Sequence, residues 1–565
     1  MLHEIAGQST ALGLILAAWL LSIGGCIGLG LLWQRTWGAH THGGERIFAA
    51  FWIGLALAMG ALQLWHFLVP VNLAAAACLL AIGGFGLVRE RAALLALRPA
   101  SASQWAALGA TLLGVLWVAH RCMRPLEHYD TGLYLLAAMT WIGDEALMPG
   151  LANLHGRLGF NNTHLLFAAL FDMGPWMNRS PNLLNGCLLT VFFAGCLHAG
   201  RNLFGASRAR AGAAFAWLII PPAMILASRY MVSLSSDLPA TLFSLLVAWR
   251  AFRLLAGEVE GAVAQRAELR DLTLLAAAGI CIKLSSLVFL GGVWLTAVFA
   301  VFPNLRQRDL LISAAIGFAL LGPWLIRNAV LSGYPLYPIS LISIPIDWRV
   351  PVESVDRTAS LIKIWARVPG GSSEIALGGW QWLESWTQRN LVLQVGVRFP
   401  LPVLLGTLGA ILVAAGRTVG RSSPAARGLW LLAPSALAFV FWFWTAPDPR
   451  FAMFVFWSIA AAGIAAAIGV WSALPAARFC VVALATALSL VSAPRDTIRS
   501  GTERGFHPLP VVEIDQFKTA SGLHVSVPVG TDKCWGTRPP CTPYPRADLR
   551  LRDRSALRSG FARGH

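Results

Sequence analysis

The sequence predicts an all-α polytopic membrane protein with about fourteen transmembrane helices and a small C-terminal appendage. Hydrophobic residues make up 56% of the 565 residues and charged residues 13%, about half the charged share of a soluble domain. Mean hydropathy is +0.63. The apolar residues come in runs of roughly 18–22, the length of helix that crosses about 30 Å of hydrocarbon.

The apolar runs place the expected spans along most of the chain. The run over 272–302 is too long for one ordinary span, and we count it as two short spans that turn near Lys283. This count puts Arg306 and Arg308 on the same side as the other basic loops. The remaining spans are expected near 11–33, 46–68, 71–88, 104–120, 183–203, 211–228, 237–255, 310–330, 397–416, 428–446, 451–470 and 478–493.

Charge asymmetry predicts the orientation. The loop from Arg89 to Arg98 is basic and therefore expected in the cytoplasm, which places loops 121–164 and 332–395 outside. We expect a multi-pass protein of the bacterial inner (cytoplasmic) membrane whose active site faces the periplasm. The net charge of +17 is spread over short loops, a pattern that anionic lipid explains and that does not indicate nucleic-acid binding.

The polar C-terminal tail has features of its own. The alternating stretch Leu523–Val529 predicts a strand. Cys534 and Cys541 are spaced to permit a short disulfide-closed loop in an oxidising compartment. The expected parts of the chain are N-terminal transmembrane helices (1–103), a transmembrane core (104–331) with an external acidic loop (121–164), an external loop (332–395), C-terminal transmembrane helices (396–493) and a small periplasmic tail domain (494–565).

The stretch from His128 to His164 interrupts the apolar pattern and concentrates Asp, His, Arg and Asn. Polar groups beside membrane spans are costly unless they face a cavity or the interface, which favours a functional site. Asp130 stands just beyond a span, where a carboxylate could act as general base or metal ligand. His128 is a candidate substrate-binding residue beside it. The structural alternative is that Asp130 caps the following helix.

A Gly-rich turn brings three further candidates, His155, Arg157 and Asn161. Arginine can engage phosphate through two N–H groups, and His and Asn side chains can bind hydroxyls. We therefore expect these residues to bind sugar or acceptor. The alternative is a loop whose His and Asn side chains satisfy its own backbone.

Asp237 is a second carboxylate expected on the outer side, where it could join Asp130 or simply cap its helix. Lys283, Arg327 and Arg450 are also expected there, although positive-inside statistics disfavour cations on that side. Cations and carboxylates gathered on one face are what a lipid-phosphate-linked substrate requires.

These motifs resemble those of the GT-C type membrane glycosyltransferases, which use polyprenyl-phosphate-linked sugars. The resemblance implies a GT-C-like fold, a catalytic acidic residue at Asp130 and a short helix pair that carries Lys283. The matching positions are Asp130, Gly279–Lys283, Pro323–Asn328 and Ser332–Pro335. The strings Tyr129–Tyr134, Gly150–Asn161 and Cys534–Pro543 are similar to a group of bacterial polytopic membrane proteins.

The function expected from residues and resemblance together is transfer of a sugar from a polyprenyl-phosphate donor to a cell-envelope acceptor. The acceptor could be a glycan, a lipid or a protein, and membrane lipids are the other expected partners. The cofactor stays open, with a divalent metal at Asp130 as one possibility. The alternatives are a non-enzymatic transporter or flippase of a lipid-linked saccharide, and a polymerase or ligase of surface polysaccharide.

Overall fold

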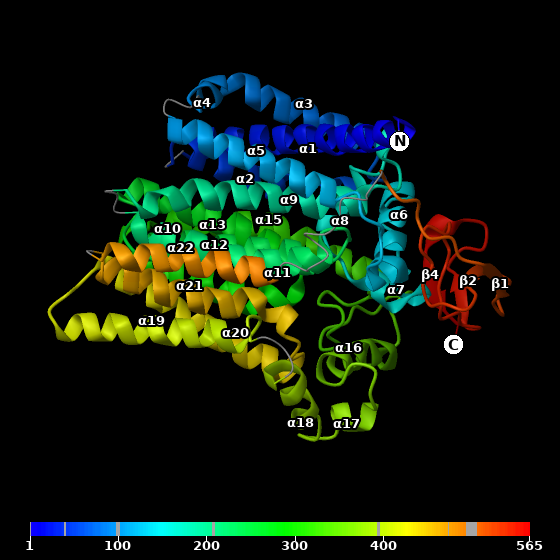
Figure 1. The fold of residues 1–565 in the computed structure, drawn as a ribbon. Helices are drawn as coiled ribbons and strands as arrows, with labels where there is room; N and C mark the ends of the chain where they lie inside the picture. The colour runs from blue at the N-terminus through cyan, green and yellow to red at the C-terminus, as the bar shows by residue number, and fades with distance from the viewer. Residues whose placement is uncertain are drawn as a thin grey trace.

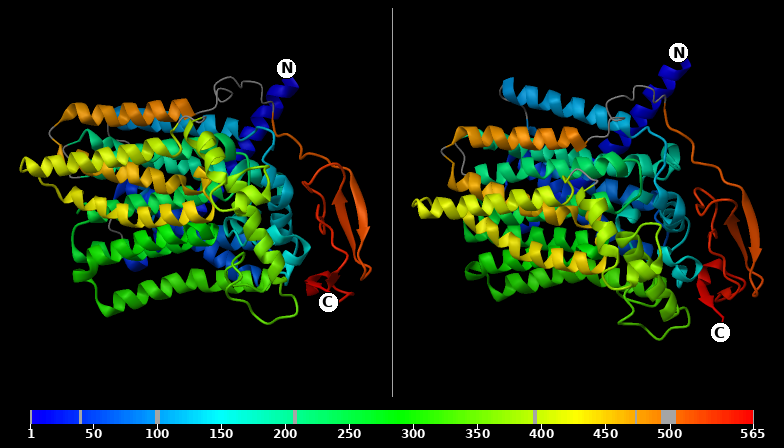
Figure 2. Two further views of the ribbon diagram at one scale, coloured as in Figure 1. Left: turned by 90° about the horizontal axis from the view of Figure 1, so that it is seen from below. Right: turned by 60° about the horizontal axis from the view of Figure 1, so that its bottom comes forward.

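The computed structural model describes residues 2–38, 41–97, 102–205, 209–392, 396–472, 474–492 and 505–564. Long helices lie side by side in a bundle, and short helices, loops and the described strands gather at one end of it (Figures 1 and 2). We call this end the polar cap and define it as the described residues of 122–179, 333–399 and 505–564. Both ends of the chain lie on the side of the polar cap (Figure 1).

Ten helices in the described part of the chain are long and apolar enough to cross a membrane. Shorter apolar helices cover Leu73–Arg89, Leu108–Arg121 and Pro475–Val491. The chain is therefore a mostly helical, multi-pass membrane protein, as composition predicted. The long apolar segments are Gly7–Trp37, Gly43–His66, Ser180–Leu203, Arg210–Tyr230, Asp237–Leu255, Leu284–Asn304, Gln307–Ser332, Pro400–Thr418, Pro424–Thr445 and Pro449–Val470.

The helices of the bundle follow one another back and forth along its length (Figure 1). In order they are α1 (Leu2–Trp37), α2 (Gly43–His66), α3 (Leu73–Arg89), α4 (Arg91–Leu95), α5 (Ala102–Arg121), α9 (Ser180–Gly200), α10 (Arg210–Leu218), α11 (Ile220–Tyr230), α12 (Asp237–Leu255), α13 (Ala262–Ile282), α14 (Leu287–Val301), α15 (Gln307–Ser332), α19 (Pro400–Thr418), α20 (Leu432–Thr445), α21 (Met453–Val470) and α22 (Pro475–Ser492).

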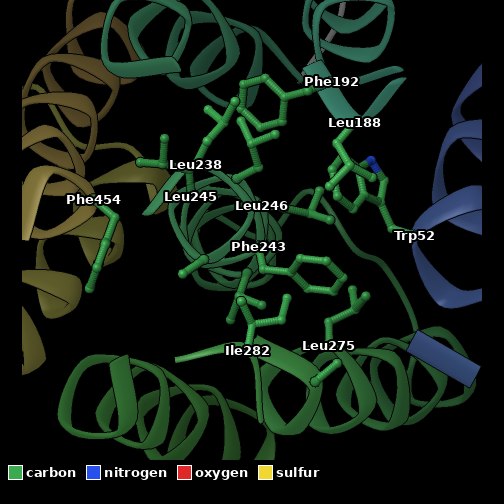
Figure 3. Close-up of a cluster of buried hydrophobic side chains, with 14 of the residues drawn as sticks. Trp52, Leu188, Phe192, Leu238, Phe243, Leu245, Leu246, Leu275, Ile282 and Phe454 are labelled. Atoms are coloured by element: carbon green, nitrogen blue, oxygen red, sulfur yellow. The ribbon is translucent and has the colours of Figure 1, made fainter. Parts of the chain in front are cut away.

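Helix α12 forms the centre of the buried core. Its Phe243 is fully buried and packs among side chains from the surrounding helices, including Trp52 of α2, Phe192 of α9, Leu275 of α13 and Phe454 of α21 (Figure 3). Since lipid is as apolar as these side chains, close packing holds such helices together more than escape from water does.

Glycine allows several pairs of helices to touch backbone to backbone, and two of these pairs illustrate it. A Cβ on Gly28 of α1 would lie 1.7 Å from the carbonyl oxygen of Gly83 on α3. A Cβ on Gly409 of α19 would lie 2.2 Å from the carbonyl carbon of Gly463 on α21. Any side chain at these crossings would force the helices apart, as at other small-residue interfaces in membranes.

The predicted turn at Lys283 is confirmed, because this residue separates α13 from α14. Helix α13 begins at Ala262, ten residues before the apolar run that starts at 272. The charges in its first half are accommodated by ion pairs. Arg250 of α12 reaches Glu268 at 2.7 Å and Asp271 at 2.8 Å, and all three side chains are buried. Paired charges can be buried where single ones would be prohibitively costly.

The polar cap consists of short elements. Its first segment contains η1 (Thr131–Leu135), α6 (Leu136–Asp144), α7 (Leu151–Leu154), η2 (Gly156–Gly159), α8 (His164–Ala169) and η3 (Gly174–Trp176). Its second contains α16 (Val352–Arg367), α17 (Ser373–Leu377), α18 (Trp382–Thr387) and η7 (Gln388–Val392).

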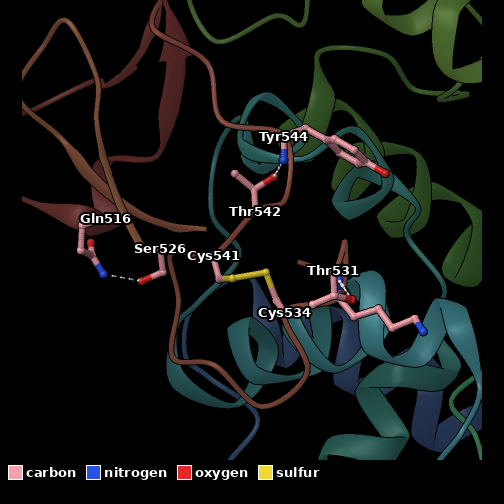
Figure 4. Close-up of a disulfide and its surroundings, with 8 residues drawn as sticks. Gln516, Ser526, Thr531, Cys534, Cys541, Thr542 and Tyr544 are labelled. Carbon is pink, nitrogen blue, oxygen red and sulfur yellow. Dashed lines mark hydrogen bonds between the residues drawn. A yellow bond between two sulfur atoms is a disulfide. The ribbon is translucent and has the colours of Figure 1, made fainter. Parts of the chain in front are cut away.

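The tail forms two small antiparallel sheets. Strand β1 (Ile514–Lys518) pairs with β2 (His524–Pro528), and β3 (Leu549–Leu551) pairs with β4 (Phe561–Arg563). Strand β2 confirms the strand predicted from alternation. A disulfide joins Cys534 and Cys541 (Figure 4). The predicted boundary between C-terminal helices and tail, at 493–494, lies outside the described residues.

Candidate functional site

Asp130 lies at the point where the chain leaves α5 and enters η1, and it does not cap the helix. It makes no side-chain cap hydrogen bond. Its Oδ1 instead accepts a hydrogen bond from Nη1 of Arg157 at 2.6 Å. The two side chains are 29% and 28% exposed, so the ion pair can be reached from solvent. Within the described residues, Oδ2 has no partner and is open to a substrate hydroxyl.

Stacked rings position Arg157. Its guanidinium carbon lies 5.5 Å from the ring centre of Tyr134. Tyr134 stacks on His155, and His155 stacks on Tyr544 of the tail at 5.5 Å between ring centres. Burial, and then the charge of Arg157, lower the pKa of His155 to about 3, so the imidazole is neutral at ordinary pH. Arg157 therefore packs on Tyr134, and Tyr134 is supported in turn by His155 and Tyr544.

A second group of charges lies at the ends of three helices. Lys283, between α13 and α14, forms an ion pair with Asp237 at the start of α12. Arg450, just before α21, bonds to Asp448 at 3.1 Å and to the hydroxyl of Tyr230 at 3.2 Å. As with Asp130, the carboxylate of Asp237 is used in an ion pair and not as a helix cap.

The two cations of this group share one aromatic ring. The ammonium of Lys283 lies 4.3 Å from the ring centre of Phe451, and the guanidinium carbon of Arg450 lies 4.6 Å from it. The side chains of Lys283 and Arg450 are 18% and 28% exposed. Both cations are therefore partly accessible at the ends of their helices.

His128 lies between the two carboxylates. The charges of both Asp130 and Asp237 act on its ring, which also contacts Tyr230 edge-on at 5.2 Å. Burial nevertheless lowers the pKa of His128 below its usual range. Its Nδ1 accepts the backbone N–H of Thr131 at 3.2 Å, so the proton of the neutral ring is on Nε2. The neutral ring can donate one hydrogen bond to a ligand.

Arg229 adds a cation that the sequence patterns did not indicate. Its side chain is exposed, and its charge also acts on His128. No hydrogen bond or ion pair of its side chain occurs among the described residues. The cluster of Asp130, Arg157, Asp237, Lys283, Asp448, Arg450 and Arg229 therefore contains four cations and three carboxylates. One positive charge is left for an anionic ligand.

Among the described residues, no three His, Cys, Asp or Glu side chains are grouped closely enough to hold a metal ion. The carboxylates of Asp130 and Asp237 are each paired with a cation.

Two of the predicted site residues serve the interior of the protein. Arg327 is 2% exposed, and it bonds to Oδ1 of Asn161 at 3.0 Å and to Nδ1 of His66 at 2.9 Å. The side-chain amide of Asn161 also donates to the backbone carbonyl of Trp324, and the indole N–H of Trp324 donates to the backbone carbonyl of Asn161. These residues line a cavity of about 30 Å³, the volume of one water molecule. The arrangement pins the 155–164 segment to α2 and α15.

The tail covers η1. The backbone N–H of Trp535 donates to the carbonyl of Gly132 at 3.0 Å. A Cβ on Gly132 would lie 2.8 Å from the Trp535 ring, so glycine is required for this approach. The hydroxyl of Tyr129 donates to Asp532. The Cys534–Cys541 disulfide closes the loop that carries Trp535, with Asp532 just before this loop and Tyr544 shortly after it (Figure 4).

Several residues of the site could not be found from sequence patterns. Tyr230 lies in an apolar run, where an aromatic residue indicates only a core or an interface, and Tyr134 belongs to a string that gave it no individual role. Tyr544 and Asp532 lie in the tail, some 400 residues from the Asp130 loop in sequence. The one signal was the cysteine pair, which marked the tail as ordered.

The fold and the site define a polytopic helical membrane protein with a partly exposed charge cluster at one end of its bundle. Residues 13–457 match the family model described as a domain of unknown function, DUF8201. The chain therefore belongs to the DUF8201 family. No curated protein and no solved structure matches it.

Proposed function

We propose that the protein is a GT-C type membrane glycosyltransferase that moves a sugar from a polyprenyl-phosphate donor to a cell-envelope acceptor. The observation that carries the proposal is the cluster itself. A solvent-accessible carboxylate held by arginine lies beside aromatic-bound cations at the ends of membrane helices. Intramembrane and interfacial charges are costly and are kept mainly for function.

In this proposal the phosphate of the donor binds at Lys283, Arg450 and Arg229. The first two are at partly exposed helix ends, so a lipid can approach them from the bilayer. Arg229 supplies the positive charge that no carboxylate of the cluster offsets. The arginine N–H groups match phosphate oxygens, and the lysine adds a point charge.

Asp130 acts as the general base on the acceptor hydroxyl. The acceptor oxygen forms a bond to the anomeric carbon of the sugar while the bond from that carbon to the phosphate oxygen breaks. The bonding electrons leave on the phosphate, and the acceptor proton passes to the Asp130 carboxylate and then to water. The hydrogen bond from Arg157 directs the carboxylate, and the cations stabilise the charge that develops on the leaving phosphate.

We further infer fourteen membrane crossings with the polar cap in the periplasm of a bacterial inner-membrane protein. Ten long apolar helices, three shorter ones and α13 give this number. The end of the bundle opposite the polar cap carries many arginines, among them Arg89, Arg210, Arg308, Arg417 and Arg427. The positive-inside rule assigns such an end to the cytoplasm.

Asp130→Asn tests the proposal. In vesicles supplied with a radiolabelled polyprenyl-phosphate sugar, the variant should insert normally and lose about 10²–10⁴-fold in transfer, the range attributed to general-base catalysis. Asp144→Asn, an exposed carboxylate of the same cap, is the matched control and should keep full activity.

Two results would contradict the proposal. Undiminished transfer by the Asp130→Asn protein would remove this carboxylate from the mechanism. Movement of the labelled lipid across the bilayer without transfer of sugar by the wild-type protein would favour a flippase instead.

A further inference from the structure

A second surface of the polar cap is built jointly by the tail and the Asp130 segment. Tyr544 is 54% exposed and Tyr129 is 43% exposed. In Figure 1 the tail covers the polar cap on the side away from the helix bundle. The tail residues of this surface therefore lie on the side of the polar cap away from the helix bundle.

The ring of Tyr544 is held rigidly. One face stacks on His155 with an angle of 12° between the rings, and His155 is supported in turn by Tyr134 at 6.4 Å. The ring's exposure leaves its other face open. A flat ring that is already fixed offers contact area to a ligand at little cost in conformational entropy.

Polar groups of both signs border this ring. Asp532 accepts the hydroxyl of Tyr129, and the ammonium of Lys533 lies 5.1 Å from the ring centre of Tyr129. The charges of Asp532 and Arg157 both act on the Tyr544 hydroxyl. Because Arg157 also binds Asp130, this surface adjoins the proposed catalytic carboxylate.

We propose that Tyr544, Tyr129, Asp532 and Lys533 form a carbohydrate-binding subsite that holds a saccharide acceptor beside Asp130. The open face of Tyr544 covers the apolar face of a sugar ring, and the surrounding carboxylate, ammonium and hydroxyl groups bind its hydroxyls. The assignment of the saccharide as acceptor rests on the proposed function. The prediction that a saccharide binds here does not rest on the proposed function. The tail that supplies Tyr544 lies beyond the family match over residues 13–457.

The test measures binding and transfer separately on the full-length protein in detergent. The probes are methyl glycosides of glucose, galactose, mannose, N-acetylglucosamine and arabinofuranose, and saturation-transfer NMR reports their binding. At least one glycoside should bind. Tyr544→Ala should weaken that binding about tenfold, as expected for loss of one aromatic contact. Tyr544→Phe keeps the stacked ring and should retain most of the binding.

Two further variants separate the subsite from other effects. Asp532→Asn leaves the ring column intact, and it should also weaken binding. Trp380→Ala removes an aromatic residue of similar exposure, 58%, from the region between α17 and α18, and it should have no effect.

The subsite is refuted if no glycoside of the panel binds the wild-type protein. It is also refuted if Tyr544→Ala binds as tightly as wild type, or if Trp380→Ala loses as much. Failure of the proposed function gives a different result, namely glycoside binding that depends on Tyr544 in a protein that transfers no sugar.

Discussion

Replacing His155 by Phe should change how the stability of the polar cap depends on pH. The imidazole is sandwiched between Tyr134 and Tyr544, is 6% exposed, and has a buried Nδ1 with no hydrogen-bond partner. Phenylalanine preserves the ring stack, and no hydrogen bond of His155 Nδ1 is lost because this atom has none. The substitution removes the imidazole, which must stay neutral in the folded state.

The size of the effect follows from the displaced pKa. The pKa of His155 is about 3 in the folded protein, against 6.5 for the free side chain. As pH falls below 6.5, His155 takes up a proton when the polar cap is locally unfolded but stays neutral when the cap is folded. The folded cap therefore loses stability relative to the locally unfolded state. At about pH 5 the loss is about 2 kcal/mol. Above about pH 6.5 the difference between wild type and variant should be small.

Hydrogen–deuterium exchange of peptides around residue 155 measures this opening, after correction for intrinsic exchange rates. Between about pH 7 and pH 5, exchange of the wild-type protein should rise about 30-fold relative to His155→Phe. Asp172 has a pKa raised by burial to about 6, so it acts in the opposite direction, but it is present in both proteins and cancels. Parallel pH profiles for the two proteins would refute the reasoning.

Other substitutions test the tail and the ion pairs. Gly132→Ala places a methyl group 2.8 Å from the Trp535 indole and should weaken tail docking by about 1–3 kcal/mol. Limited proteolysis should then release the tail faster. The control Gly143→Ala meets nothing within 4 Å and should leave the rate of release unchanged. Arg250→Met removes the cation that pairs with the buried carboxylates of Glu268 and Asp271 and should cost about 3–5 kcal/mol, measured by thermal unfolding in detergent. Arg35→Met, at a side chain that is 50% exposed, should cost less than about 1 kcal/mol, and equal losses would contradict the buried pairing. Cys534→Ser should destabilise the docked tail by about 2–3 kcal/mol, and the same proteolysis assay measures the effect. An unchanged rate of release would show that the disulfide does not stabilise the docked tail.

Sequence patterns were informative wherever a property belongs to one segment. Apolar runs identified the helical membrane class, and alternation located strand β2. The combination of run length and charge asymmetry found the turn at Lys283. These features depend on how a single stretch of about 20 residues partitions between water and lipid, which its own composition determines.

The patterns were less informative about charged residues inside helices. Helix α13 begins ten residues before the apolar run at 272, and this part of it carries Arg266, Glu268, Arg270 and Asp271. Helix α13 includes them because Arg250 and Asp309 supply partners from other helices. A hydropathy pattern reflects the cost of burying a charge, but it contains no information about a partner on another helix that offsets this cost.

By itself, the sequence determined that this is a multi-pass helical membrane protein and that Asp130 and Arg157 belong to a polar stretch that interrupts the apolar pattern. Only the tertiary structure decided that these two residues pair, that Asp237 pairs with Lys283, and that Arg327 lies in the interior beside His66. It also decided that a tail residue stacks on His155. The physical reason is that ion pairs and ring contacts depend on distances between separate segments, which helix packing sets and local composition does not encode.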